Sequence, residues 1–286
     1  MGKRSVIFLF RLAMICGICA ALYFGWCALE NQGPVNDAEF IFAGTKNDAD
    51  CAILLSEGYC VVVDTGEAQD APHIVELLKE HEVETIDCLI LTHPDQDHVG
   101  GAQELVRQFA IKQVVVPYFS GEKAVYQTLM NEIQRENIPV LMLYRDRQFI
   151  FGDLDIRIFP PEDFYYAQTN DYSLAILLEH GDNCVFMAGD AEKTRLNELL
   201  DLNLPTEIDL YKAAHHGRDS TKGVALIEKL QPQKTVVTAK QAESRIQMAL
   251  EQVGSEVFYT VGQDVTFISD GTSLEVLESS ASAEMG

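Results

Sequence analysis

Between residues 38 and 278, short apolar segments alternate with amphipathic segments, and this alternation is the feature that most restricts the possible folds. Segments such as "YCVVVDTG" and "IDCLILTH" are apolar and end in polar residues, as expected for buried strands that lead into loops. Segments such as "APHIVELLKEHEV" carry apolar residues at helical spacing. Because the two kinds of segment alternate through two comparable halves of the chain, the pattern predicts one α/β domain, a sandwich of two sheets with helices outside.

The charge balance restricts the partners of this domain. The chain of 286 residues has 21 Lys and Arg against 44 Asp and Glu, which gives a formal net charge of -23. A surface of this sign repels polyanions unless metal ions or a local basic patch compensates. The composition therefore argues against tight, extended binding of nucleic acid, although it does not exclude attack on a phosphodiester that is held at a metal site.

The N-terminal segment differs from the rest of the chain. Lys3, Arg4 and Arg11 precede an uninterrupted apolar run over residues 12–29, which is nearly long enough to cross a bilayer as a helix. We therefore expect a membrane anchor with its N-terminus inside the cell and the following domain outside the cytoplasm. The alternative is a cleaved signal peptide, which yields a secreted protein. The predicted anchor, linker, domain and flexible tail span residues 1–30, 31–37, 38–278 and 279–286.

Cysteine does not identify the cellular compartment. Cys51 and Cys60 flank a predicted hairpin, so a disulfide between them is one option. Cys88 and Cys184 lie in apolar strands, which predicts that both are buried thiols.

Polar residues with metal-binding side chains gather where predicted strands end. Such loops collect the functional residues of α/β folds, because rigid strands hold short loops in place. Four candidates come from one loop, "HPDQDH", and its two imidazoles and two carboxylates suit a divalent ion such as Zn or Mn. The full set of candidates is Asp64, His93, Asp95, Asp97, His98, Asn170, Asp190, His215 and His216.

Each of these motifs alone has a simpler explanation. An Asp-rich turn is usually a solvated loop, and a lone histidine at a strand end is more often structural than a ligand. The combination is more specific, because "HPDQDH", "AGD" and "HHG" follow three different apolar strands. Together they favour a metal site over three unrelated polar loops.

These motifs resemble those of the metallo-β-lactamase superfamily, whose signature is His-x-His-x-Asp-His after a strand. The sequence resembles in particular the extracytoplasmic domain of the ComEC-type competence proteins, through "VVVDTG", "LILTHPDQDHVGG", "NDYSLAILL", "CVFMAGD" and "LYKAAHHG". The resemblance covers roughly residues 38 to 278. It implies an αββα sandwich and a centre with one or two divalent metal ions.

The resemblance also implies which residues are ligands. One ion would bind Asp97, His98, Asp190 and one of the paired histidines, for which His216 is favoured. The second ion would use His93, Asp95 and the bridging carboxylate of Asp190. Asn170 stands where the superfamily usually has a histidine, and His180 lies in a predicted turn, "EHGDN", where we expect a surface residue.

Two of the predicted ligands depart from the superfamily pattern. Asp95 and Asn170 supply oxygen where nitrogen is usual, so the second position should bind Zn more weakly and accept Mn or Mg. The competence family also has "DVGQGD" near its start and a Gly-His-Pro stretch after "HHG", and this chain has "FAGTKNDAD" and "TAKQAESRIQ" instead.

The resemblance gives three residues further roles. Asp97 would ligate one ion and steer the attacking water. Asp64 would accept a hydrogen bond from a ligand histidine and fix its tautomer, unless it is only a turn residue before Thr65. His215 would donate a proton to the leaving group or contact a phosphate oxygen.

The expected activity is hydrolysis of a phosphodiester or phosphoester outside the membrane. Single-stranded DNA is the substrate that the competence family suggests, whereas a small phosphoester or a phosphorylcholine-like headgroup fits the acidic composition better. The alternative from a different class is a non-catalytic metal-binding or ligand-binding domain that keeps the fold. The sequence does not indicate an oligomeric state.

Overall fold

The computed structural model describes residues 35–277. Residues 36–277 belong to one compact unit, and the account below concerns this unit. The predicted anchor and the predicted tail lie outside the described residues. Within the described part of the chain, no helix is both long enough and apolar enough to cross a membrane.

The first sheet has eight strands, and its two sides differ in direction. In order across the sheet they are β17 (Leu274–Leu277), β16 (Val265–Ser269), β1 (Ala38–Phe42), β2 (Ala52–Ser56), β3 (Tyr59–Val63), β5 (Cys88–Ile90), β7 (Val114–Pro117) and β8 (Val140–Leu143). The pairs from β17 to β3 are antiparallel, and the pairs from β3 to β8 are parallel. Parallel neighbours need crossover connections, which here contain α2 (Ala71–Glu80), α3 (Gln96–Val99), α4 (Ala102–Gln108) and α5 (Ala124–Arg135).

The second sheet has seven strands and the same mixture of directions. In order they are β15 (Glu256–Tyr259), β14 (Lys234–Val237), β13 (Leu210–Lys212), β12 (Asn183–Met187), β11 (Ala175–His180), β10 (Leu154–Phe159) and β9 (Arg147–Phe151). The parallel strands β12 to β15 are joined through α6 (Lys193–Asp201), α7 (Thr221–Leu230) and α8 (Ser244–Val253). A small parallel pair, β4 (Thr85–Ile86) and β6 (Ala110–Ile111), lies outside both sheets.

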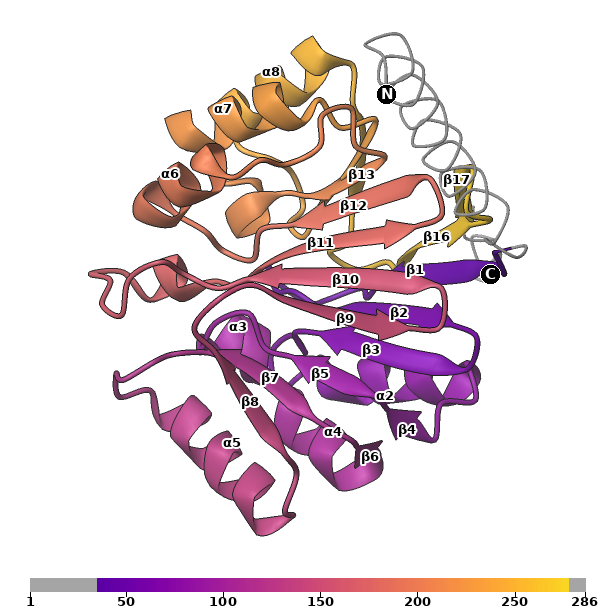
Figure 1. Cartoon of the computed structure of the whole chain (residues 1–286), viewed down its shortest axis with the longest axis vertical. Helices are drawn as coiled ribbons and strands as arrows, with labels where there is room; N and C mark the ends of the chain where they lie inside the picture. The colour runs from indigo at the N-terminus through magenta and orange to yellow at the C-terminus, as the bar shows by residue number, and fades with distance from the viewer. Residues whose placement is uncertain (1–34, 278–286) are drawn as a thin grey trace, which may run out of the picture. The chain divides into compact units, whose positions relative to one another are not determined.

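Three apolar cores hold these layers together. In β1, Phe40 and Phe42 pack into the core between the sheets, whereas Ile41 packs into the core under α2, α4 and α5. The third core lies between the second sheet and α6, α7 and α8. Because strand side chains alternate between the two faces, consecutive apolar residues in the central strands let each sheet bury both faces there. The result is the predicted αββα sandwich, with helices on both outer faces (Figure 1).

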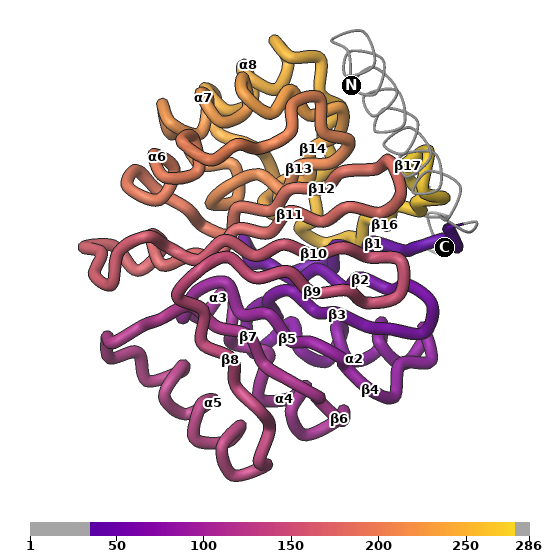
Figure 2. Tube along the Cα trace, viewed as in Figure 1, coloured from indigo at the N-terminus to yellow at the C-terminus, as the bar shows by residue number. Residues whose placement is uncertain are grey.

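The last strands of the described chain return to its beginning. β16 pairs antiparallel with β1, so the yellow end of the trace runs beside its indigo start (Figure 2). β17 pairs only with β16 among the described strands, which leaves β1 between β16 and β2.

Two sequence-based expectations are wrong or incomplete. His180 is not at the surface: β11 continues through it, its ring is fully buried, and Nδ1 lies 2.6 Å from the Ser269 hydroxyl. The turn begins one residue later, at Gly181, which has a positive φ. Cys51 and Cys60 are free, buried thiols and not a disulfide, Cys88 is buried as predicted, and Cys184 is only partly buried.

Candidate metal centre

The predicted ligands come together where strands of both sheets end. Asp64 follows β3, and His93 to His98 follow β5 and enter α3. Asp190 follows β12, and the paired histidines follow β13. Backbone hydrogen bonds join these loops, since the amide of Thr65 donates to the carbonyl of His98 (2.7 Å). The loops lie on the side of the sandwich where Figure 1 labels α3.

His98 is held by a buried carboxylate. Its Nδ1–H donates to Oδ2 of Asp64 (2.7 Å), and Asp64 also accepts hydrogen bonds from the amide (2.7 Å) and hydroxyl (2.6 Å) of Thr92. This arrangement fixes the ring and turns Nε2 toward Asp190, whose Oδ1 lies 3.2 Å away. Asp64 therefore lies where its predicted orienting role requires.

His216 is held in a comparable way from the opposite side. Its Nδ1 lies 2.9 Å from the Thr238 hydroxyl and 3.2 Å from Oδ1 of Asp50. Its Nε2 lies 3.1 Å from Oδ2 of Asp190 and 3.3 Å from Oδ2 of Asp97. His215 and His216 both have left-handed backbone angles, with φ of 48° and 53°, a conformation that costs free energy for residues other than glycine. This turn points two consecutive imidazoles toward the same carboxylate, Asp190.

The centre contains buried polar atoms without partners. Nε2 of His93, His98 and His216 and Oδ1 of Asp190 make no hydrogen bond to any described residue. One ligand atom from each of Asp50, His98, Asp190 and His216 lies within 4.8 Å of the others. Unpartnered polar atoms are costly in a protein interior, and imidazole nitrogen with carboxylate oxygen is a donor set that divalent metals prefer. These residues therefore fit a divalent metal ion.

The charges of the cluster are strongly coupled. Burial alone would lower the pKa of His98 and His216, but nearby carboxylates, above all Asp190, raise both pKa values well above the usual range. Burial would raise the pKa of Asp190, but the two imidazoles hold it well below the usual range. Protons on the imidazoles thus balance the carboxylates when no metal does so, and a metal ion that binds the imidazoles must displace them.

The other predicted ligands are arranged less favourably. His93 is buried with its ring centroid 4.0 Å from that of His98. Asp95 is instead paired with Lys123, whose Nζ lies 3.0 Å from Oδ1. The amide of Asn170 donates to Glu192 (2.9 Å) and lies 3.2 Å from Nε2 of His215. The structure thus brings His93 to the centre, while Asp95 and Asn170 are engaged by neighbouring side chains.

His215 lies at the edge of the cluster. Its Nε2 is 3.9 Å from Oδ2 of Asp190, and its Nδ1 is 3.4 Å from Glu192. Burial lowers its pKa more than the nearby carboxylates raise it, so this imidazole is neutral at pH 7. It is the more exposed of the two paired histidines and the one that solvent reaches.

Three residues of the centre were not among the sequence-based candidates. Asp50, in the loop between β1 and β2, contacts Lys212 at the end of β13, and Thr238 follows β14 and donates to Asp50 (2.5 Å). Thr238 and Lys212 lie at strand ends, which is the signal that identified the other candidates. Asp50 lies in "TKNDAD", which resembles an ordinary polar turn, and in the sequence Lys212 is only a cation close to "HHG".

The sequence matches the model of a known superfamily. The family model described as "Metallo-beta-lactamase superfamily" matches residues 44–240, and the chain belongs to this superfamily. The predicted resemblance and the predicted sandwich are thereby confirmed.

Two individual relatives support the resemblance to competence proteins. The chain is 24% identical over 250 residues to ComE operon protein 3 of Bacillus subtilis, which covers 83% of this chain and 32% of that protein. It is 23% identical over 191 residues to Recombination protein 2 of Haemophilus influenzae, which covers 65% of this chain and 22% of that protein. The chain therefore spans a third or less of the length of these two relatives.

Solved structures share the fold at low identity. The metallo-beta-lactamase fold protein YhfI of Bacillus subtilis matches with a TM-score of 0.57 and 13% identity, over 82% of this chain and 100% of that one. Tm1679, described as a metal-dependent hydrolase of the beta-lactamase superfamily, matches with a TM-score of 0.54 and 14% identity, over 80% of this chain and 98% of that one. At these identities, the likeness establishes the fold and not the reaction.

Proposed function

We propose that this protein is a metal-dependent hydrolase that cleaves a phosphoester or phosphodiester bond. The observation that carries the proposal is the convergence of two unpartnered Nε2 atoms, those of His98 and His216, on the buried carboxylate of Asp190. Membership of the superfamily and the hydrolase among its structural relatives support the same reaction class. The apolar run over residues 12–29 supports a location at the outer face of the cell membrane, by the anchor argument given above.

Asp97, His98, Asp190 and His216 would hold the first ion, either Zn or Mn. A divalent ion at this position lowers the pKa of water and stabilises the negative charge that develops on a phosphoryl group. His93 and Asp95 would contribute to a second position, which the Asp95–Lys123 pair weakens.

The side chains around the ion have separate tasks. Burial would raise the pKa of Asp97, but the imidazole of His216, whose Nε2 lies 3.3 Å from Oδ2, and the charge of His98 lower it, so Asp97 is an ionised carboxylate. It is 30% exposed, which lets it accept a hydrogen bond from an attacking water at the mouth of the centre. His215 is neutral, and its N–H is suited to donate a hydrogen bond to a phosphoryl oxygen. Asp64 keeps Nε2 of His98 directed inward.

A cavity beside His215 offers space for the leaving group. It has a volume of about 390 Å³, and Leu196, Tyr211, Ile227 and Ile246 are among its apolar lining residues. His215 and Glu192 line this cavity and also contact Asn170 of the centre. The cavity is large enough for an organic group of moderate size but not for a long polymer.

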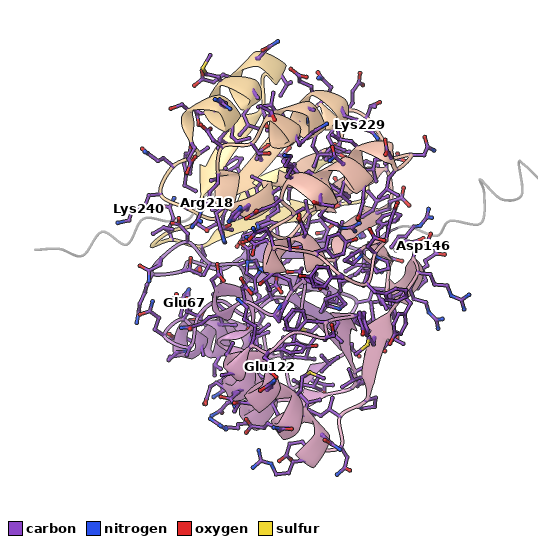
Figure 3. All side chains as sticks on the ribbon, turned by 90° about the vertical axis from the view of Figure 1, so that its left-hand side faces the viewer. Glu67, Glu122, Asp146, Arg218, Lys229 and Lys240 are labelled. Carbon is purple, nitrogen blue, oxygen red and sulfur yellow. The ribbon has the colours of Figure 1, made fainter. Side chains whose placement is uncertain are left out.

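The charges at the rim of this cavity are mixed, with three carboxylates and two cations, and do not suit an extended polyanion. Glu192 accepts a hydrogen bond from Asn170, and Asp219 and Glu243 each accept one from a backbone amide (2.8 Å). The rim cations Lys193 and Arg218 are exposed, and Arg218 is labelled in Figure 3. We therefore favour a small phosphoester with an apolar leaving group over single-stranded DNA, which the competence relatives suggest.

A second candidate function is a non-catalytic metal-binding or ligand-binding domain. It is favoured by the engagement of Asp95 and Asn170, because a dinuclear hydrolase uses both positions. Such a protein would bind an ion at His98 and His216 without turnover.

Hydrolysis of bis(4-nitrophenyl) phosphate after removal of metal and addition of Mn or Zn tests the proposal. The full-length protein should release nitrophenolate only with metal, and Asp97→Asn should lower the rate by about a hundredfold, since an ionised carboxylate beside the attacking water is lost. Glu122→Gln is the control, because Glu122 is an exposed residue, which is labelled in Figure 3. Bound metal without turnover on this substrate or on 4-nitrophenyl phosphorylcholine would favour the non-catalytic function.

A further inference from the structure

Lys212 places a buried cation inside the metal centre. Its side chain is only 4% exposed, at the end of β13. Its Nζ contacts Oδ2 of Asp50, lies 3.7 Å from Oδ1 of Asp190, and donates to the carbonyl of Gly189 (3.3 Å). Lysine is almost never fully buried unless it is paired, so this position has a specific purpose. The contacts of its Nζ are with Asp50, Asp190 and Gly189, so we assign Lys212 a role that it exerts through these neighbours.

The contacts of Asp50 show what that purpose is. Oδ2 of Asp50 is taken by Lys212, and Oδ1 accepts the hydrogen bond of Thr238 and faces Nδ1 of His216 at 3.2 Å. Both oxygens are therefore engaged on the side of His216 that faces away from Asp190. Asp50 relates to His216 as Asp64 relates to His98: each carboxylate faces Nδ1 and leaves Nε2 toward the centre.

We propose that Lys212 is an internal cation that withholds Asp50 from the metal ion and keeps it as the orienting partner of His216. Proximity alone groups Asp50 with His98, Asp190 and His216 as potential ligands. The contact with Lys212 gives the two aspartates different roles. Asp50 positions the ligand His216, whereas Asp190 is itself a ligand. Lys212 also occupies space next to Oδ1 of Asp190 that a further cation would otherwise use. It thus lowers the affinity of the centre for divalent ions and limits how many it holds.

Titration of the metal-free full chain with Mn²⁺, followed by electron paramagnetic resonance of the free ion, tests this role without any substrate. Lys212→Met keeps the length of the side chain and removes its charge. We expect this variant to bind Mn²⁺ about tenfold more tightly, or to take up an additional equivalent, because one repelling charge is removed and one carboxylate is released. Folded Lys212→Met with wild-type or weaker affinity would overturn the proposal.

Two further variants separate charge from coordination. In Lys212→Met/Asp50→Asn the released carboxylate is absent, while the amide oxygen still accepts from Nδ1 of His216, so the affinity should return close to that of the wild type. An affinity far below the wild type would mean that Asp50 is already a ligand beside Lys212, and the proposal would be wrong. Lys112→Met is the matched control, because Lys112 pairs with Asp87 (2.6 Å) at an exposed position outside the centre, and its affinity should not change.

Asp50→Asn alone covers the case in which Lys212→Met does not fold. Lys212 would then lose its main partner and turn to Asp190, so the affinity for Mn²⁺ should fall by about tenfold while circular dichroism stays unchanged. Wild-type affinity in this variant would contradict the proposal. Because only metal binding is measured, the result is independent of whether the protein hydrolyses phosphoesters.

Discussion

Around His98 and His216, each imidazole faces a buried carboxylate with its Nδ1, whereas around His93 the nearby candidate ligands are engaged by other side chains. The first half of the centre is therefore preorganised, because its rings are fixed before an ion arrives. The second half, around His93 and Asp95, can bind a metal ion only after Asp95 has broken its ion pair with Lys123. The same loop, "HPDQDH", supplies both halves, so ligand identity alone does not decide which half binds metal. The difference lies in what surrounds each ligand.

Removal of Asp190, the carboxylate that both halves of the centre share, should have the largest effect on metal affinity. Asp190→Ala removes the group that both His98 and His216 face, and it leaves two imidazoles in a buried space without their main counter-charge. We expect metal affinity to fall by at least about a hundredfold. Metal content by mass spectrometry on the purified protein checks this result, with Glu122→Ala as the control. Retention of a full equivalent in Asp190→Ala would show that the centre described above is not the binding site.

A substitution behind the preorganised half should have the next largest effect. Asp64→Asn keeps the shape of the side chain but replaces the carboxylate acceptor that fixes His98 with an amide. The expected loss of metal affinity is about 10- to 100-fold. Asp95→Asn in the second half should change the affinity for the first ion much less, and isothermal titration calorimetry compares the two variants. Equal losses in both would remove the distinction between the halves.

The pH dependence of metal binding should test the two histidines of the first half, His98 and His216. Neighbouring carboxylates raise the pKa of His98 and His216, so an ion must displace protons, and affinity should rise by about tenfold per pH unit for each proton displaced. In the metal-free protein, the protonated imidazoles stabilise the fold at low pH, and this contribution is lost as pH rises through their raised pKa values. Thermal melts with and without Mn²⁺ across the neutral range measure both trends. A metal affinity that does not change with pH would argue against these two ligands.

The smallest effect should come from releasing Asp95. Lys123 and Asp95 are 39% and 23% exposed, and solvent weakens such pairs. Lys123→Gln should therefore strengthen binding of a second Mn²⁺ by only about threefold, without changing the first. Titration beyond one equivalent detects this change, and Lys112→Gln serves as the control. A second ion that binds equally well in both variants would show that Lys123 does not restrain the second half.

The fold was predictable because each sheet buries both faces. Apolar runs such as β3 and β5 and amphipathic runs such as α2 stand out in the sequence for that reason. The C-terminal ends of strands likewise identified Asp64, His98, Asp190 and His216 as candidates. Their exact roles were less accessible, because Asp95 and Asn170 are of suitable types and only their neighbours show that they are engaged elsewhere.

Asp50 and Lys212 show where sequence reasoning stops. They lie far apart in the chain, Asp50 in the loop after β1 of the first sheet and Lys212 at the end of β13 in the second, and their contact appears only when the two sheets are packed together. No local pattern predicts such a pair, since a lysine before "HHG" and an aspartate in a polar turn are both typical of surfaces. The prediction that His180 is a surface residue was wrong for a related reason, because the buried ring contacts Ser269 of a strand that is distant in the sequence.

The return of β16 to β1 has a consequence for synthesis on the ribosome. β1 is among the first elements of this unit to emerge, yet one of its two partners follows almost all the others in the chain. Until β16 has been translated, one edge of β1 is open, and an open edge is a site for pairing with other nascent chains. The loop that carries Asp50 follows β1 directly. We therefore expect complete assembly of the centre to depend also on β16, which is translated after the crossover helices of both sheets. Truncation before β16 would thus expose one edge of β1, the first strand of the unit to be translated, and leave a chain that is prone to aggregate.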